Sequence, residues 1–115
     1  MRLDHHGIDI LAPKTSTVLA TADGEVAFAE NDEQLGLCII INHGENGWIT
    51  KYGHNELLLV KVGEFVRKGQ AIAIFGGSDK VSTGAHLHYG MFYRGKPVNP
   101  LDYLPEIPRL KIAQS

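Results

Sequence analysis

The sequence predicts an all-β domain, built as an antiparallel β-sheet sandwich, and three observations support this fold class. Short apolar runs recur at near-regular spacing along the 115 residues, and turn residues close each run. Most of the thirteen glycines fall between these runs. No window longer than about ten residues keeps a helical apolar period without a break. We expect one domain over residues 1–104 and a C-terminal tail over residues 105–115.

The strands are predicted in chain order from the apolar runs and the turns between them. Asp23-Gly24, Asn31-Asp32 and Asn42-His43-Gly44 supply the first turns, because Gly, Asn and Asp adopt turn geometry readily. A break is expected at 95–97, and a single helical turn near 100–104. The predicted strands are IDIL (8–11), TVLATA (17–22), EVAFA (25–29), LCIII (37–41), WITKYGH (48–54), LLLVKVG (57–63), AIAIFGG (71–77) and HLHYGMFY (86–93).

The segment VKVGEFVRKGQAIAIFG (60–76) alternates apolar and polar residues around two glycine turns, which predicts two tight hairpins. This pattern resembles the hammerhead half-barrel of lipoyl and biotinyl carrier domains. A carrier needs a modifiable lysine at the tip of a hairpin, and Lys51 and Lys80 both lie outside such a context. The resemblance is therefore interpreted as one of fold. A carrier or small-molecule-binding half-barrel stays as an alternative, which an intact mass equal to that of the bare sequence would exclude.

Charge and composition exclude several classes of protein. The formal net charge of −2 and the absence of a Lys/Arg stripe argue against a nucleic-acid partner. Cys38 is the only cysteine and lies in an apolar run, which predicts a buried, unreactive thiol and leaves the redox compartment open. No apolar run approaches the roughly 18 residues of a transmembrane helix. The oligomeric state is not predicted.

The chain opens with MRLDHHGID, so the dense polar motif HHGID begins only a few residues from its first residue. We therefore expect an N-terminally truncated domain. An export signal or anchor in the missing part would direct the protein to the periplasm or cell envelope.

Five of the six histidines fall in three compact groups: His5 and His6, then His54, then His86 and His88. In a strand alternate side chains share a face, so His86 and His88 are expected to point the same way, with Leu87 buried behind them. Two imidazoles so close disfavour double protonation, and the neutral ring is the form that binds a metal ion.

A carboxylate joins these imidazoles near the N-terminus. Gly7 argues against a helix there, and in a strand His5, Gly7 and Asp9 would share the outward face. His5, Asp9 and one histidine of the HLH pair would occupy three positions of a tetrahedral Zn²⁺ ion. The fourth position would stay open, as in catalytic zinc sites. Such an ion lowers the pKa of water and polarises a carbonyl, chemistry that suits amide hydrolysis. Each motif alone also occurs among ordinary turn or surface residues, but all three in this order within one short β-domain favour a site.

The motifs H-H-G-I-D, Y-G-H and H-L-H, in this order, resemble those of the lysostaphin-type (LytM-like) zinc endopeptidases of bacterial cell-wall metabolism. The likeness extends to TADGEVAFA, VKVGEFVRKGQAIA, STGAHLHYG and GKPVNPLDYL, and so covers residues 5–104. The resemblance implies that His5, Asp9 and His88 are the zinc ligands. It also implies that His54 and His86 are the catalytic pair beside the metal, with their division of roles open.

The resemblance further implies Zn²⁺ as cofactor and a peptidoglycan peptide as substrate, bound in a shallow groove over the β-sheet of a duplicated hybrid motif fold. Trp48, Tyr52 and Tyr89 would line this groove or pack in the interior. His6 is expected to be a non-ligand and His43 an exposed loop residue. The alternative is a non-catalytic LytM-like regulator that binds cell wall or activates an amidase.

Two features depart from the family pattern. Gly90 stands where members often carry an acidic residue, and the domain begins later than usual. The first removes a group that could support the metal ligands, and leaves the strand more flexible. The five metal-site and catalytic positions, in contrast, match the family pattern.

Overall fold

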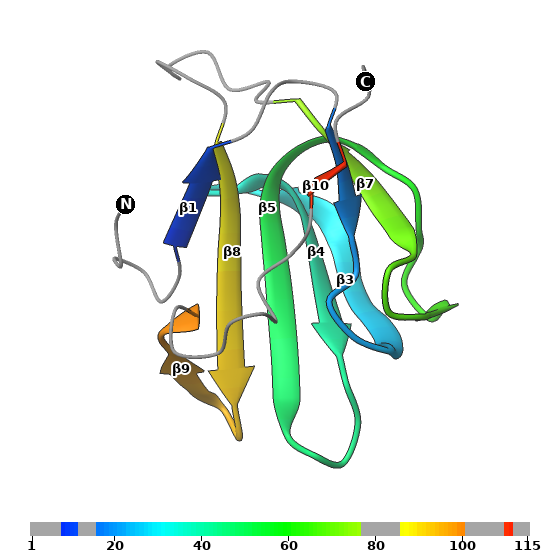
Figure 1. Ribbon diagram of the computed structural model, residues 1–115, viewed down its shortest axis with the longest axis vertical. Coiled ribbons are helices and arrows are strands. Elements are labelled where there is room, and N and C mark those ends of the chain that lie inside the picture. Colours follow the sequence, from blue (N-terminus) through cyan, green and yellow to red (C-terminus); the bar gives the residue numbers. More distant parts are fainter. Residues whose placement is uncertain (1–7, 12–15, 77–85, 101–109, 112–115) are drawn as a thin grey trace.

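The computed structural model describes residues 8–11, 16–76, 86–100 and 110–111, and of residues 8–11, 86 and 110–111 it describes the backbone alone. The described part is all-β, as predicted (Figure 1). Its strands are β1 (Ile8–Leu11), β2 (Ser16–Leu19), β3 (Gly24–Asp32), β4 (Gly36–Asn42), β5 (Trp48–Leu58), β6 (Phe65–Val66), β7 (Ala71–Phe75), β8 (His86–Tyr93), β9 (Lys96–Val98) and β10 (Leu110–Lys111). No helix within these ranges is long and apolar enough to cross a membrane.

All strand pairs are antiparallel and belong to one sheet, whose main path runs β10-β2-β7-β5-β4-β3-β6. Strand β8 branches from this path, because it pairs with β5, β1 and β9. The sheet curls into a half-barrel, with β2 and β10 drawn in front of the other strands in Figure 1. The expected antiparallel architecture is therefore confirmed.

Strand β5 changes its partner along one edge. Residues 48–53 pair with β8, whereas Asn55 to Leu58 pair with β7, and β4 follows the opposite edge through both halves. The sequence predicts two separate strands here, WITKYGH (48–54) and LLLVKVG (57–63). The structure instead continues one strand through them. The change of partner falls at His54.

The core lies on one face of the curled sheet. Tyr52 and Tyr89 are both 0% exposed, and their ring centroids are 5.4 Å apart. These two tyrosines are therefore packing aromatics, whereas Trp48 is half-buried against Tyr93 at a centroid distance of 4.7 Å. The buried apolar cluster consists of Val18, Ala20, Val26, Ile39, Ile41, Tyr52, Val60, Val66, Ile72, Ala73, Phe75, Leu87, Tyr89 and Met91.

Segment 60–76 forms two turns but not the two hairpins that the sequence predicts. The backbone N–H of Glu64 donates to the carbonyl of Lys61, and that of Gln70 donates to the carbonyl of Arg67. The strands beside these turns pair elsewhere, β6 with β3 and β7 with β2 and β5. Two successive turns of the same kind therefore carry the chain across the half-barrel, as in a hammerhead.

The end of the described chain adds edge strands. The expected break at 95–97 is a turn at Arg94 and Gly95, both with positive φ, followed by β9 paired with β8. Proline is tolerated on such an edge strand. Within residues 105–115, expected as a tail, the structure describes only β10, which pairs with β2. The helical turn expected at 100–104 lies outside the described residues, apart from Pro100.

Candidate metal and catalytic site

Three neighbouring strands bring two of the predicted site residues to the same level of the sheet. Asp9 of β1 is the register partner of His88 on β8, and His88 is in turn the partner of Gly53 on β5. Figure 1 shows β1, β8 and β5 side by side. Register partners occupy positions on the same face of a sheet. The backbone therefore places the predicted carboxylate ligand directly opposite the predicted imidazole ligand.

The other predicted residues of the HxGxD and HLH motifs are placed in part. His86 occupies β8 two residues before His88, with Leu11 as its register partner, so the two histidines hold positions on one face. Leu87 between them is 0% exposed, as the alternation predicts. His5 and His6 lie outside the described residues.

His54 meets His88 across the β5–β8 pair. The two ring centroids are 6.4 Å apart and the ring planes stand at 86°, an edge-to-face arrangement. Regular alternation along β5 would have put His54 on the face of Tyr52, because its neighbour Gly53 is the register partner of His88. The ring contact therefore requires a local departure from strand geometry.

That departure is a β-bulge. Between the pairs Ile39↔Tyr52 and Leu37↔Asn55 the β4–β5 register shifts, with one extra residue on β5. His54 has φ of 67°, in the left-handed region, which few residues other than glycine adopt. Strained backbone of this kind persists only where the surroundings hold it, and it is often found at functional sites.

Leu35, in the turn between β3 and β4, holds this bulge from one side. The backbone N–H of His54 donates to the carbonyl oxygen of Leu35 at 2.6 Å. A Cβ atom at Gly53 would lie 2.9 Å from the Cβ of Leu35, so only glycine allows this approach. The sequence does not single out Leu35. The one available signal is the glycine that precedes the histidine in Tyr-Gly-His.

The donor chemistry of the site fits a zinc ion. Carboxylate oxygen and imidazole nitrogen are ligands that Zn²⁺ takes, and His88 is 7% exposed, as a ligand in a water-poor site would be. Among the side chains that the structure describes, no group of three His, Cys, Asp or Glu residues gathers. The side chains of His5 and Asp9 lie outside that part.

Two further residues with reactive side chains, Cys38 and His43, have structural roles. Cys38 on β4 is 0% exposed, which confirms the predicted burial, and burial raises the pKa of its thiol to about 11. The expectation of an exposed His43 is wrong. His43 is half-buried, because Nδ1 lies 2.7 Å from the carbonyl oxygen of Asp23 and Nε2 lies 2.8 Å from Thr50 Oγ1.

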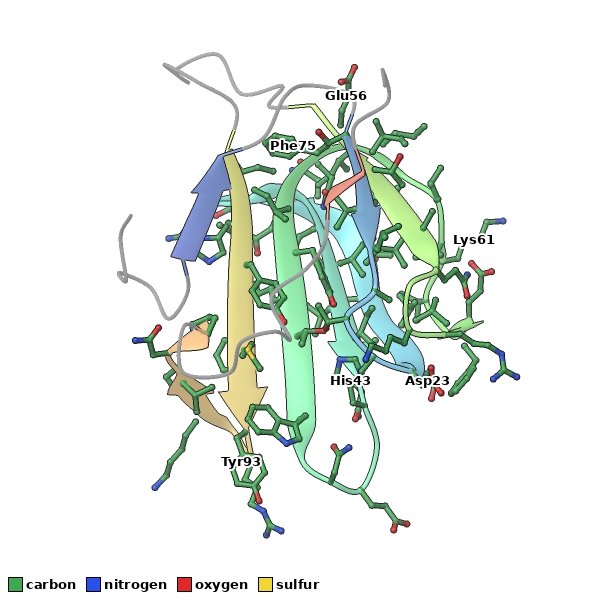
Figure 2. The ribbon with its side chains drawn as sticks, viewed as in Figure 1. Asp23, His43, Glu56, Lys61, Phe75 and Tyr93 are labelled. Atoms are coloured by element: carbon green, nitrogen blue, oxygen red, sulfur yellow. The ribbon has the colours of Figure 1, made fainter. Side chains whose placement is uncertain are left out.

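A cavity of about 230 Å³ lies at the other end of β5 from His54. It is lined by Thr21, Ala22, His43, Asn46, Trp48, Thr50 and Met91. Figure 2 shows His43 in the lower half of the sheet and Phe75, the register partner of Asn55, near its upper end. The cavity is therefore separate from the row of Asp9, His88 and His54.

Comparisons with known proteins relate this chain to proteins that act on the bacterial cell wall. The chain is 43% identical over 101 residues to the murein hydrolase activator NlpD of Escherichia coli, covering 87% of this chain and 26% of NlpD. It is 36% identical over 114 residues to the peptidoglycan DD-endopeptidase ShyA of Vibrio cholerae, covering 96% of this chain and 26% of ShyA. The chain thus spans about a quarter of the length of these curated relatives.

Among solved structures, a zinc-containing peptidase from Vibrio cholerae superposes with a TM-score of 0.74 at 35% identity, covering 82% of this chain and 28% of that protein. The family model described as Peptidase family M23 matches residues 3–100, nearly the whole described sheet. The resemblance found in the sequence motifs is thereby confirmed, and the chain belongs to peptidase family M23.

Proposed function

We propose that this chain is a zinc-dependent endopeptidase that hydrolyses peptide bonds in the stem peptides or cross-bridges of peptidoglycan. One observation carries the proposal: the bulge in β5 turns His54 away from its regular position and toward His88, whose register partner is Asp9. A residue held in strained backbone so that two imidazoles meet is typical of a catalytic site.

In this proposal His5, Asp9 and His88 hold the metal. Bound zinc would act as a Lewis acid: it would polarise the peptide carbonyl and lower the pKa of water enough for hydroxide to form near neutral pH. His86 removes the proton from the attacking water and returns it to the leaving amine. His54 donates a hydrogen bond to the oxyanion that develops on the carbonyl oxygen.

The placement of His54 on a different strand from His86 supports a catalytic pair with two separate roles. His86 shares β8 with His88, whereas His54 approaches from β5 with its ring edge-to-face against His88. Groups carried on two neighbouring strands can flank a substrate carbonyl from two directions. The contact between the His54 and His88 rings sets one of these groups beside the proposed ligand before substrate binds, as catalytic preorganisation requires.

The substrate class and the location rest on the relatives. One is named a peptidoglycan DD-endopeptidase, and a Pseudomonas aeruginosa relative at 42% identity is named a lipoprotein NlpD/LppB homolog. A peptidoglycan peptide as substrate and a place in the cell envelope are accordingly part of the proposal. The activity of the whole protein is likewise part of the proposal, because this chain spans only about a quarter of the length of these relatives.

A second candidate function is that of a LytM-like regulator that binds cell wall or activates an amidase without cleaving peptides itself. The specific observation in its favour is the 43% identity to a murein hydrolase activator. The two candidates differ in turnover. An endopeptidase cleaves purified muropeptides alone, whereas a regulator leaves them intact.

The test combines metal analysis with defined muropeptides of known cross-linking. The wild type should retain one zinc and release products whose masses identify the cleaved bond. His88→Ala should lose zinc and turnover together, whereas His86→Ala should keep zinc and lose turnover. His43→Ala, at the other end of the sheet, serves as the histidine control and should retain both. Stoichiometric zinc in His88→Ala would contradict the ligand assignment, and a zinc-loaded wild type without cleavage would favour the regulator.

A further inference from the structure

We infer that Asn55 is a positioning residue for His54: its buried side-chain amide locks the bulge that directs the histidine toward His88. The inference rests on the proposed function for its consequence in catalysis. Its structural part stands on the hydrogen bonds of Asn55 itself.

Asn55 is 0% exposed, which is unusual for an amide side chain. Its Nδ2 donates to the carbonyl oxygen of Tyr52 at 3.0 Å, three residues back along β5. The same Nδ2 donates to the carbonyl oxygen of Leu37, its register partner on β4, at 3.1 Å. One amide group therefore spans Gly53 and His54 and ties both sides of the bulge together.

These two bonds suit the irregular ladder and not a regular one. A bulge interrupts the backbone pairing of its two strands, and buried carbonyl oxygens beside the interruption still require donors. The amide of Asn55 supplies a donor to one carbonyl oxygen on each strand: that of Tyr52, which is buried, and that of Leu37, which is half-buried. Together with the His54 N–H bond to Leu35, it fixes the backbone on both sides of the left-handed residue.

The orientation of the amide follows from its partners. Both contacts are carbonyl oxygens, which only accept, so the nitrogen and not Oδ1 must face them. Asn55 Oδ1 is buried and has no hydrogen-bond partner among the described residues. The side chain thus leaves its own acceptor unsatisfied while it satisfies two backbone oxygens. Its contribution lies in the geometry it imposes.

The experiment compares two variants of Asn55 with a matched control. Asn55→Ala removes both donated bonds. Asn55→Asp keeps the shape but sets carboxylate oxygen against two carbonyl oxygens, and so reverses the attraction. Thr50→Val is the control, because Thr50 is a buried polar residue of the same strand, 3% exposed, whose hydroxyl contacts Tyr52 and His43. It loses buried hydrogen bonds to the Tyr52 and His43 side chains but keeps both bonds that Asn55 donates.

Three quantities are measured on each folded variant: hydrogen exchange of the His54 amide, retained zinc, and the steady-state kinetics of muropeptide cleavage. In Asn55→Ala the His54 amide should exchange at least about tenfold faster, and zinc should be retained. The kcat should fall by about 10- to 100-fold, as for a misplaced catalytic group, while KM changes by less than about threefold. Asn55→Asp should change the His54 exchange rate and the kcat more than Asn55→Ala does, and Thr50→Val should leave both unchanged.

Unchanged His54 exchange in Asn55→Ala would overturn the inference, as would a loss of kcat in Thr50→Val equal to that in Asn55→Ala. A wild type without cleavage would refute the proposed endopeptidase. The exchange of His54 would still test the positioning role in that case, since it is measured without substrate.

Discussion

The ring of His54 meets that of His88 edge-to-face at a centroid distance of 6.4 Å, although the two residues hold register positions that a regular sheet would set on opposite faces. The extra residue in β5 resolves this conflict. It also coincides with the point at which β5 leaves β8 and joins β7. The candidate site therefore lies where the sheet itself is irregular, and the residues that shape the irregularity become the most informative ones to change.

Gly53→Ala should damage this junction. The added Cβ would lie 2.9 Å from the Cβ of Leu35, which belongs to a backbone-fixed part of that residue and cannot rotate away. We expect a loss of roughly 1–3 kcal/mol in the free energy of unfolding, as for other overpacked sites. Urea denaturation measures it, and muropeptide cleavage should fall in parallel.

Gly63→Ala is the control for that change. Its φ of 96° strains any side chain, yet nothing lies within 4 Å of the added atom. It should lower stability by about 1 kcal/mol from backbone strain alone and leave cleavage intact. A Gly53→Ala protein as stable as the wild type would show that Leu35 can move aside.

Cys38 should resist alkylation in the folded protein. It is 0% exposed and burial raises its pKa to about 11, so the thiolate is scarce and inaccessible at pH 8. Iodoacetamide should add no mass to the native protein and one adduct per chain in denaturant. Native labelling at the rate of a free thiol would contradict the buried placement on β4.

The strands could be predicted from sequence because their signals are local. The run LCIII is apolar and bounded by turn residues, and it became β4. The same reasoning ends a strand at His54, because the polar pair Asn55-Glu56 interrupts the apolar runs on either side. In the fold Asn55 pairs with Leu37 and Phe75 in neighbouring strands, and such long-range pairing overrides a local signal.

The candidate site was predictable as a set of residues but not as a geometry. The spacing of His86 and His88 fixes their common face by alternation alone. The approach of His54 goes with a bulge between β4 and β5 and with a hydrogen bond to the carbonyl of Leu35, in the turn before β4, and these contacts join segments far apart in the sequence. His43 was misjudged for a related reason, since its partners Asp23 and Thr50 come from other segments.

His43 should make stability depend on pH. Burial lowers its pKa below the ordinary 6.5, against smaller opposing effects of the Asp23 carbonyl and charge. The folded state therefore binds a proton less readily than the unfolded chain. The stability that neutral His43 contributes is present above pH 6.5 and is lost as the pH falls toward the folded pKa.

His43→Gln removes this titration and keeps polar contacts. The difference in unfolding free energy between wild type and variant should be largest above pH 7 and shrink as the pH falls through 6. Chemical denaturation across this range measures it. A difference that is constant with pH would mean that His43 is equally easy to protonate in both states.

Asp32 should stabilise the turn that reaches His54. Its Oδ1 accepts from the backbone N–H of Gln34 at 2.8 Å and of Leu35 at 3.0 Å, and these bonds lower its pKa below the ordinary 3.8. The stabilisation is present above pH 3.8 and is lost as the pH falls through the folded pKa. Because Asp32 lies at the surface and is only half-buried, solvent screens its bonds, and we expect Asp32→Ala to cost no more than about 1 kcal/mol at neutral pH.

The more telling readout of Asp32→Ala is hydrogen exchange at His54. Loss of the two capping bonds loosens Leu35, whose carbonyl accepts the His54 N–H, so that amide should exchange faster at neutral pH. Asp32→Asn keeps an acceptor and should restore most of the protection. Asp23→Ala is the matched control, because Asp23 accepts from the Lys68 N–H at 2.7 Å in a turn remote from His54. Equal acceleration at His54 in both alanine variants would mean that the turn at Leu35 has no specific hold on the bulge.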